Sequence, residues 1–140
     1  MNKIIKNYLS IFENLNLSEL AKFKDVLDNN VTFIDPFNEV KGAKNFISLF
    51  EKNLKTINNP KFIIINVTSF KEVYFVKWEM KFFAFGKNEN IVGLSEIKIN
   101  KFGLISYHKD YWDSFNEFYI KLPIFGFIFK IFYKLIKLKL

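Results

Sequence analysis

The residues of this sequence that are best suited to moving a proton are Asp35, His108 and Asp110. Asp35 lies in the otherwise apolar segment 33–37, and burial among such neighbours would make its carboxylate a stronger base. His108 and Asp110 are two positions apart, so on a strand their side chains would project from the same face. A histidine beside an aspartate is a common acid/base pair, because the carboxylate orients the ring. These residue types predict proton transfer, with Asp35 as the base and His108 with Asp110 as the acid or orienting pair.

Each of these residues also has a purely structural explanation. Asp35 would cap the turn at Pro36 by accepting backbone hydrogen bonds through its side chain. A buried hydrogen bond between His108 and Asp110 would hold the last strand in place, and the same pair could bind a ligand hydroxyl without catalysis. The sequence leaves these alternatives open.

The composition excludes several other kinds of site. A chain with one histidine cannot form a three-histidine metal centre, and the absence of cysteine removes disulfides, thiolate nucleophiles and cysteine metal sites. The sequence contains no glycine-rich phosphate loop, nucleophile elbow or dinucleotide fingerprint. We therefore predict no metal and no cofactor.

The net charge of +7 raises the question of nucleic-acid binding. All 21 basic residues are lysines, whereas base recognition and bidentate phosphate contacts favour arginine, so we predict no nucleic-acid partner. The first seven residues intersperse apolar with polar or charged positions and lack the continuous apolar stretch of a signal peptide, which predicts a cytoplasmic protein.

The first half of the chain has the apolar spacing of helices. The chain has 140 residues, half of them apolar and 19 of them phenylalanine, which favours one domain with a large core or an aromatic cavity. Apolar positions three and four apart predict helices over residues 4–16, 18–27 and 42–54. Ser18 is the expected N-cap of the second helix, and Asp28-Asn29-Asn30 its expected end.

After residue 60 the apolar pattern changes from helical to extended. A short strand over 31–35 is followed later in the chain by four extended runs, over 62–67, 73–85, 91–99 and 104–112, which predict an antiparallel meander. The segment 76–82 alternates apolar with charged residues, so one face of its strand is apolar and the other is solvated. This order predicts an α+β domain, in which a curved sheet packs against helices around an apolar pocket.

Several short motifs in this order resemble those of one group of known proteins. The motifs are Phe33-Ile34-Asp35-Pro36, Val40-Lys41-Gly42, Trp78-Glu79-Met80, Gly93-Leu94-Ser95-Glu96-Ile97 and His108-Lys109-Asp110-Tyr111-Trp112-Asp113. Residues 3–115 are thereby similar to the SnoaL-like and ketosteroid isomerase-like families of the nuclear transport factor 2-like superfamily. The resemblance implies a cone-shaped, strongly curved antiparallel sheet with three N-terminal helices on its concave face. It also implies a domain over 1–115, a C-terminal helical extension over 116–140, and a homodimer formed through the outer face of the sheet.

The same resemblance implies roles for individual residues. In ketosteroid isomerases the aspartate of the Asp-Pro motif is the general base, and Asp35 stands at that place. Tyr8 lies one turn before the place of an oxyanion-binding tyrosine, where this chain has Ile11, and Ser95 occupies the place of a second donor. The residues implied to bind substrate inside the cone are Tyr8, Phe33, Trp78, Met80, Phe82, Ser95, Ile97 and Trp112.

The residues and the resemblance together lead to two hypotheses for function. The first is a cofactor-independent enzyme of the isomerase, dehydratase or cyclase type that acts on a hydrophobic, lipid-like or polycyclic small molecule. The second is a non-catalytic binding or carrier module for an apolar ligand. Trp78 and Trp112 do not decide between them, because large rings serve a packed core and a binding pocket equally well.

The end of the chain has a different character from the rest. Residues 124–140 predict a helix in which Lys130, Lys134 and Lys137 occupy one narrow face and the other faces are apolar. Seventeen helical residues reach only about 26 Å, which argues against a transmembrane span. The pattern suits a helix lying in a membrane interface, peripheral at the inner membrane face. It suits equally well a helix that packs across the mouth of the cone or onto a second subunit.

Overall fold

The structure of the protein is a computed structural model that describes residues 2–84 and 86–138. The helical segments of the first half are α1 (Lys3–Glu13), the 3-10 helix η1 (Glu19–Asp25) and α2 (Ala43–Thr56). The strands are β1 (Leu27–Ile34), β2 (Glu39–Lys41), β3 (Asn58–Phe70), β4 (Val73–Ala84), β5 (Lys87–Ile99) and β6 (Ile105–Trp112). The C-terminal segments are α3 (Ser114–Glu117), the 3-10 helix η2 (Tyr119–Lys121) and α4 (Phe125–Ile136). The predicted strand 73–85 and helix 124–140 include Phe85, Lys139 and Leu140, which lie outside the described residues.

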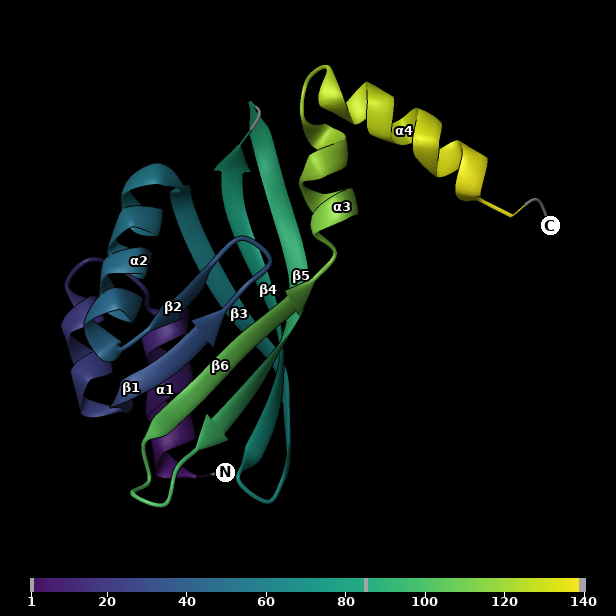
Figure 1. The fold of residues 1–140 in the computed structure, drawn as a ribbon. Coiled ribbons are helices and arrows are strands. Elements are labelled where there is room, and N and C mark those ends of the chain that lie inside the picture. Colours follow the sequence, from purple (N-terminus) through teal and green to yellow (C-terminus); the bar gives the residue numbers. More distant parts are fainter. Residues whose placement is uncertain (1, 85, 139–140) are drawn as a thin grey trace.

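The six strands form one curved sheet in the order β2-β1-β6-β5-β4-β3 (Figure 1). Strands β3 to β6 pair antiparallel in sequence order, which confirms the predicted meander. Strand β1 runs parallel to β6, with Phe33 beside His108, so the sheet is mixed and contains a parallel pair that the sequence pattern did not indicate. Register shifts in β3 are the kind of irregularity that bends a strand. The predicted α+β class with a curved sheet is confirmed.

Helical segments α1, η1 and α2 pack on the same side of the sheet (Figure 1). Each has one apolar side that faces the core, and the buried residues are Ile5, Tyr8, Leu9, Ile11 and Phe12 of α1, Leu20 and Phe23 of η1, and Phe46 and Phe50 of α2. Their rings meet mainly edge to face, as in the pairs Phe23–Phe46 at 5.0 Å and Phe12–Phe50 at 5.2 Å between centroids. Five of the 19 phenylalanines, Phe12, Phe23, Phe33, Phe46 and Phe50, are buried in the core between the helices and the sheet.

Strand β4 has the apolar face that its alternation predicts. Val76 and Trp78 are buried, whereas Lys77 and Lys81 are exposed on the opposite face. Because side chains alternate along a strand, the same period directs Met80 and Phe82 to the helix side.

The segment from Asn16 to Asn30 differs from the expected α-helix and its end. It forms the 3-10 helix η1, and Asn16 rather than Ser18 accepts the first N–H groups, those of Ser18 and Glu19, at 2.9 and 3.2 Å. Asp28, Asn29 and Asn30 do not end a helix but lie in β1. The Asp28 carboxylate accepts the N–H of Asn30, and such local side-chain bonds compete with helix formation.

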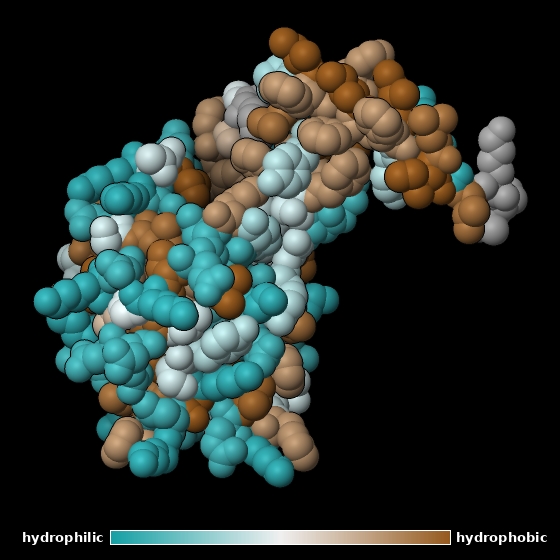
Figure 2. Space-filling view, viewed as in Figure 1, coloured by the Kyte–Doolittle hydropathy of each residue, from teal (hydrophilic) through white to brown (hydrophobic). Residues whose placement is uncertain are grey.

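Helix α4 stands apart from the sheet (Figure 1), and its surface is mostly apolar (Figure 2). It contacts the rest of the protein through η2 and through Phe115 of α3. No helix within residues 2–84 or 86–138 combines the length and apolar character needed to traverse a bilayer.

Gly93 allows the indole of Trp78 to lie against the backbone of β5. The two residues are paired across β4 and β5, and a Cβ at residue 93 would lie 2.3 Å from a ring carbon of Trp78. We predict that Gly93→Ala displaces the indole and lowers the free energy of unfolding by about 1–3 kcal/mol, because overpacking forces a core side chain out of place. Urea unfolding followed by tryptophan fluorescence measures the change. Val92→Thr, on the outer face, should stay within about 0.5 kcal/mol of the parent, and equal stability of all three proteins would contradict the prediction.

Candidate functional site

Five side chains in the core form a buried polar network, which runs Trp78, Ser95, Asp110, His108, Tyr8. Trp78 Nε1 lies 2.8 Å from Ser95 Oγ, which in turn lies 2.5 Å from Asp110 Oδ1. The same Asp110 oxygen lies 2.7 Å from His108 Nε2, and His108 Nδ1 lies 2.6 Å from the Tyr8 hydroxyl. The network thus joins β4, β5, β6 and α1 through side chains alone.

Strand register and helix periodicity place these residues together. Ser95 and Asp110 are directly paired across β5 and β6, so their side chains project from the same face. His108 and Asp110 share that face because they are two positions apart on β6. Tyr8 reaches His108 from the buried side of α1.

One arrangement of hydrogens, with the Asp110 carboxylate ionised and His108 neutral, gives every polar group of the network a partner. The Trp78 indole N–H can only donate, so Ser95 accepts it and donates its own hydrogen to Asp110. The carboxylate can only accept, so His108 carries its proton on Nε2 and donates to Asp110 as well. His108 Nδ1 is then the acceptor for the Tyr8 hydroxyl. Every member of the network has a partner in this arrangement.

The network is almost completely removed from solvent. Tyr8 is 0%, Ser95 3% and His108 4% exposed. Burial raises the pKa of the Tyr8 phenol well above its ordinary value, and the negative charge of Asp110 raises it further. Phe33 packs edge to face on the His108 ring, with centroids 5.1 Å apart. Tyr8 therefore remains a protonated donor that holds the imidazole in place.

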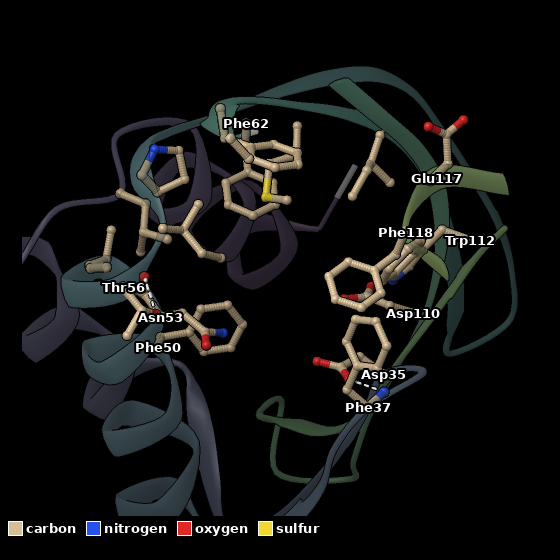
Figure 3. A pocket seen from close by; sticks show the side chains of 18 of the residues that line it. Asp35, Phe37, Phe50, Asn53, Thr56, Phe62, Asp110, Trp112, Glu117 and Phe118 are labelled. Carbon is tan, nitrogen blue, oxygen red and sulfur yellow. Dashed lines mark hydrogen bonds between the residues drawn. The ribbon is translucent and has the colours of Figure 1, made fainter. Parts of the chain in front are cut away.

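A cavity of about 320 Å³ adjoins the network (Figure 3). This volume lies at the lower end of the range for small-molecule sites. Its walls come from α2, β3, β4, β6, α3 and the turn between β1 and β2, and they are mainly apolar. The aromatic residues that line it are Phe37, Phe50, Phe62, Trp78, Phe82, Phe83, Trp112 and Phe118.

Asp110 lies at the boundary between the network and this cavity. Its carboxylate lines the cavity and also lines a second one of about 20 Å³, which it shares with His108, Ser95, Ile97 and Trp78. Oδ1 accepts both hydrogen bonds of the network, and within the described residues no hydrogen bond is made to Oδ2. One oxygen of Asp110 is therefore held by the protein, and the other is available to a ligand.

Asp35 also lines the cavity, but its carboxylate is engaged by the turn that follows it. Oδ1 accepts the N–H groups of Phe37 and Asn38, each at 2.7 Å. The Asn38 side-chain amide lies 3.0 Å from both carboxylate oxygens. These contacts match the turn-capping alternative that the sequence left open, while Oδ2 keeps capacity for a further donor.

The other residues expected at the site fall into three groups. Trp78, Met80, Phe82 and Trp112 line the larger cavity. His108, Ser95 and Ile97 line the smaller one and not the larger. Tyr8 and Phe33 line neither and act from behind, through contacts to His108. An inward-facing position on the sheet does not guarantee access to the cavity, because α1 and the phenylalanine core fill its narrow end.

Sequence reasoning missed the parts of the wall that come from helices and the turn. These residues include Phe50, Asn53 and Leu54 of α2, Phe37 and Asn38 of the turn, and Glu117 and Phe118 of the C-terminal segment. Apolar spacing in 42–54 signals a buried helix face but cannot tell a packed face from a cavity wall. Within residues 2–84 and 86–138, no three His, Asp or Glu side chains are grouped closely enough to hold a metal ion.

Comparison with known proteins relates the chain to others by structure. No protein-family model and no curated protein matches the sequence. An NTF2-like protein of unknown function from Burkholderia pseudomallei superposes with a TM-score of 0.71 at 13% identity, over 81% of this chain and 93% of that one. An LEH-like epoxide hydrolase from M. tuberculosis has a TM-score of 0.68 at 11% identity, over 83% and 84%. A protein of the SnoaL-like family from Agrobacterium tumefaciens has a TM-score of 0.66 at 13% identity, over 79% and 94%.

These matches confirm the NTF2-like fold that the motifs and the order of elements implied. At such low sequence identity the likeness concerns the fold. Because one fold supports different reactions, the chemistry has to be argued from this chain's own cavity and network.

The raised pKa of Tyr8 leads to a pH-dependent contribution to stability. Above about pH 10 the unfolded state loses the phenolic proton while the folded state keeps it, so the stabilisation is lost as the pH rises. Tyr8→Phe leaves His108 Nδ1 unpaired and should cost about 1–3 kcal/mol near neutral pH. We predict that this difference from the parent shrinks by up to about 1.4 kcal/mol for each pH unit above 10.

Chemical denaturation of both proteins at a series of pH values measures this difference. Tyr111→Phe is the matched control, because the Tyr111 hydroxyl is on the exposed surface beside Glu96. A difference between Tyr8→Phe and the parent that stays constant above pH 10 would contradict the role assigned to burial.

Proposed function

We propose that this protein is a cofactor-independent acid/base enzyme of the isomerase, dehydratase or cyclase type, acting on an apolar small molecule in the larger cavity. The observation that carries the proposal is the arrangement of Asp110. Ser95 and His108 hold one of its carboxylate oxygens, and no hydrogen bond is made to the other within the described residues. Asp110 also lines the apolar cavity. A general base has to be fixed in position and open to its substrate, and Asp110 meets both requirements.

In the proposed reaction Asp110 Oδ2 accepts a proton from a carbon next to a carbonyl group of the ligand. The electrons of that C–H bond form an enolate. Return of the proton from Asp110 to a different carbon gives isomerisation. Loss of a hydroxyl group from the β-carbon gives dehydration, in which the proton from Asp110 is transferred to the departing oxygen to form water. Attack of the enolate carbon on a second carbonyl gives cyclisation, in which the same proton is transferred to the new alkoxide. The apolar walls limit the access of water, which strengthens the electrostatic interactions of the carboxylate.

His108, Ser95 and Tyr8 are positioning residues in this proposal. They touch Asp110 Oδ1 or one another and do not line the larger cavity. A fully satisfied buried network locks the side chains that compose it, so Oδ2 presents a single direction to the ligand. Asp35 is a second ligand contact in this proposal, because it lines the same cavity and its Oδ2, which accepts a hydrogen bond from the Asn38 amide, can accept another from a ligand hydroxyl.

The charges of the cavity indicate the class of ligand. Asp35, Asp110 and Glu117 are its only ionisable side chains among the described lining residues, and all three are acidic. Lys121 lies 3.1 Å from Glu117 and compensates that carboxylate in part. A carboxylate ligand would meet like charges in an apolar setting, whereas a neutral or cationic ligand would not. We therefore propose that the substrate is either an uncharged molecule or a protonated amine, and not a carboxylic acid.

The aromatic residues beside these carboxylates suit the same ligands. Phe37 lies 5.3 Å from Trp112 and 5.0 Å from Phe118 between ring centroids, next to Asp35 and Asp110 (Figure 3). Ring faces attract ammonium groups by about 0.5–2 kcal/mol, and they also bury apolar ligand surface.

A binding or carrier module is the second candidate, favoured by a different observation. Within the described residues, the lining of the larger cavity includes no histidine, lysine or tyrosine that could stabilise an enolate oxygen. The side-chain donors in the lining are the neutral amides of Asn38, Asn53 and Asn58, the Thr56 hydroxyl and the indole N–H groups of Trp78 and Trp112. A carrier needs the apolar cavity alone.

Hydrogen–deuterium exchange distinguishes the two candidates without knowledge of the natural substrate. We predict that the protein accelerates exchange of the acidic C–H protons of apolar ketones in heavy water, with β-tetralone and an unconjugated ketosteroid as probes, followed by mass spectrometry. Asp110→Asn should slow the catalysed exchange by about 100-fold or more, because it removes the base. With a ketosteroid probe that carries a hydroxyl group, Asp35→Asn should weaken binding more than it slows exchange at saturation, whereas binding of β-tetralone, which has no hydroxyl, should change little.

Asp25→Asn is the matched control, since Asp25 is an exposed carboxylate outside the cavity. A probe that binds by calorimetry but exchanges at the rate of the uncatalysed solution would favour the carrier. Exchange that is equally fast in Asp110→Asn and the parent would exclude Asp110 as the base.

The charge preference is tested with ligands of one shape and different charge. We predict that naphthylmethylamine binds about tenfold or more tightly than naphthoate, with naphthylmethanol between them, because about 1.4 kcal/mol of electrostatic preference corresponds to a factor of ten. Isothermal titration calorimetry at neutral pH measures the three affinities. Asp110→Asn should narrow the gap between amine and acid, and tighter binding of the acid would refute the proposed ligand class.

A further inference from the structure

Helix α4 concentrates the exposed apolar surface of the protein. Of the twenty large apolar side chains that are exposed in the described residues, ten lie between residues 124 and 138. Ile124, Leu135 and Ile136 are each more than 75% exposed, and Gly126 is the only buried residue of the helix. Figure 2 shows this surface as a continuous apolar region at one end of the molecule. A surface of this kind calls for a partner.

The helix has three sides with different surroundings. Phe129 and Tyr133 pack on Phe115, with ring centroids 5.9 and 5.6 Å apart. Lys130 and Lys134 lie on a second side, which Lys137 extends just beyond the helix. The third side consists of Phe125, Ile128, Ile131, Phe132, Leu135 and Ile136, which are between 43% and 78% exposed. The free apolar side is thus bordered by lysines.

The charges around α4 are of one sign. After Glu117 the sequence contains no acidic residue, and it contains five lysines between 121 and 140. Lys121 is paired with Glu89 and Glu117, at 2.6 and 3.1 Å. Within the described residues Lys130, Lys134 and Lys137 form no ion pair, so their charge is available to an anionic partner.

The segment that leads into α4 forms part of the wall of the larger cavity. Glu117 and Phe118 line that cavity, and α4 begins at Phe125. Gly126 lets α4 pack closely on η2, since a Cβ there would lie 2.2 Å from the carbonyl oxygen of Ile120. A partner bound to α4 is therefore linked to the cavity wall through α3 and η2.

We propose that α4 docks on the surface of a bilayer that contains anionic lipids, with its axis in the membrane plane. Twelve residues of helix span about 18 Å, which is too short to cross a hydrocarbon core of about 30 Å. An apolar side bordered by lysines matches acyl chains below and anionic headgroups above. Protein interfaces are instead depleted in lysine, and a second copy of α4 would bring like charges together. Bilayer docking links the cavity wall to a phase in which apolar molecules dissolve, and it does not depend on the proposed reaction.

Vesicle sedimentation of the full chain tests the proposal. The vesicles are phosphatidylcholine alone and phosphatidylcholine with phosphatidylglycerol, and we expect clearly tighter binding to the anionic vesicles. Replacement of Lys130, Lys134 and Lys137 by Gln should weaken that binding about 100-fold, since each lysine near an anionic surface is worth roughly a factor of five. The matched control replaces Lys24, Lys44 and Lys52, which are exposed lysines distant from α4 in sequence, by Gln and should change it by less than about threefold.

The apolar side is tested separately with Ile128→Ser combined with Phe132→Ser, which should reduce vesicle binding while the circular dichroism spectrum of the α+β domain is kept. Equal binding by the parent and the Lys130, Lys134 and Lys137 variant, or no binding by the parent, would overturn the proposal. Sedimentation velocity without vesicles tests whether α4 binds a second copy of the chain instead. If the parent does not bind vesicles but forms a dimer, and the Ile128→Ser, Phe132→Ser variant is a monomer, the partner of α4 is a second copy.

Discussion

The hydrogen-bonded network of Tyr8, His108, Asp110, Ser95 and Trp78 is the interaction on which the rest of the structure depends. It connects α1 to three neighbouring strands inside a core that is otherwise aromatic. A buried polar group without a partner costs a large part of a small domain's stability, so each of these groups restricts where the others can lie. The helix and the strands are held in one relative position by this requirement as well as by apolar packing.

Asp110 links this structural requirement to chemistry, because its two oxygens face different surroundings. The oxygen bound by His108 and Ser95 is held by the core, whereas the other accepts no hydrogen bond within the described residues, and Asp110 lines the cavity. Asp35 has a contrasting arrangement, since the turn that it caps engages both of its oxygens. The two aspartates therefore differ mainly in how many of their carboxylate oxygens accept hydrogen bonds from the protein, and less in burial. Asp110 is for this reason the stronger candidate for moving a proton.

The protein separates its charges in space. The cavity holds acidic side chains among apolar walls, and the C-terminal helix holds lysines beside an apolar face. The two regions meet at Glu117 and Phe118, where Lys121 pairs with Glu117. Such an arrangement would let the helix attract an anionic surface while the cavity selects against anionic ligands. The net charge of +7 alone conceals this division.

The sequence by itself determined α1, α2, the meander and the apolar face of β4, because helical and extended periods are local properties of the chain. It also placed His108 and Asp110 on one face through their spacing of two. Only the tertiary structure decided that β1 lies parallel to β6, that Tyr8 binds His108 across 100 positions, and that Asp110 rather than His108 reaches the cavity. These contacts join distant segments, and their geometry is set by the curvature of the sheet and the seating of α1, which no local pattern encodes.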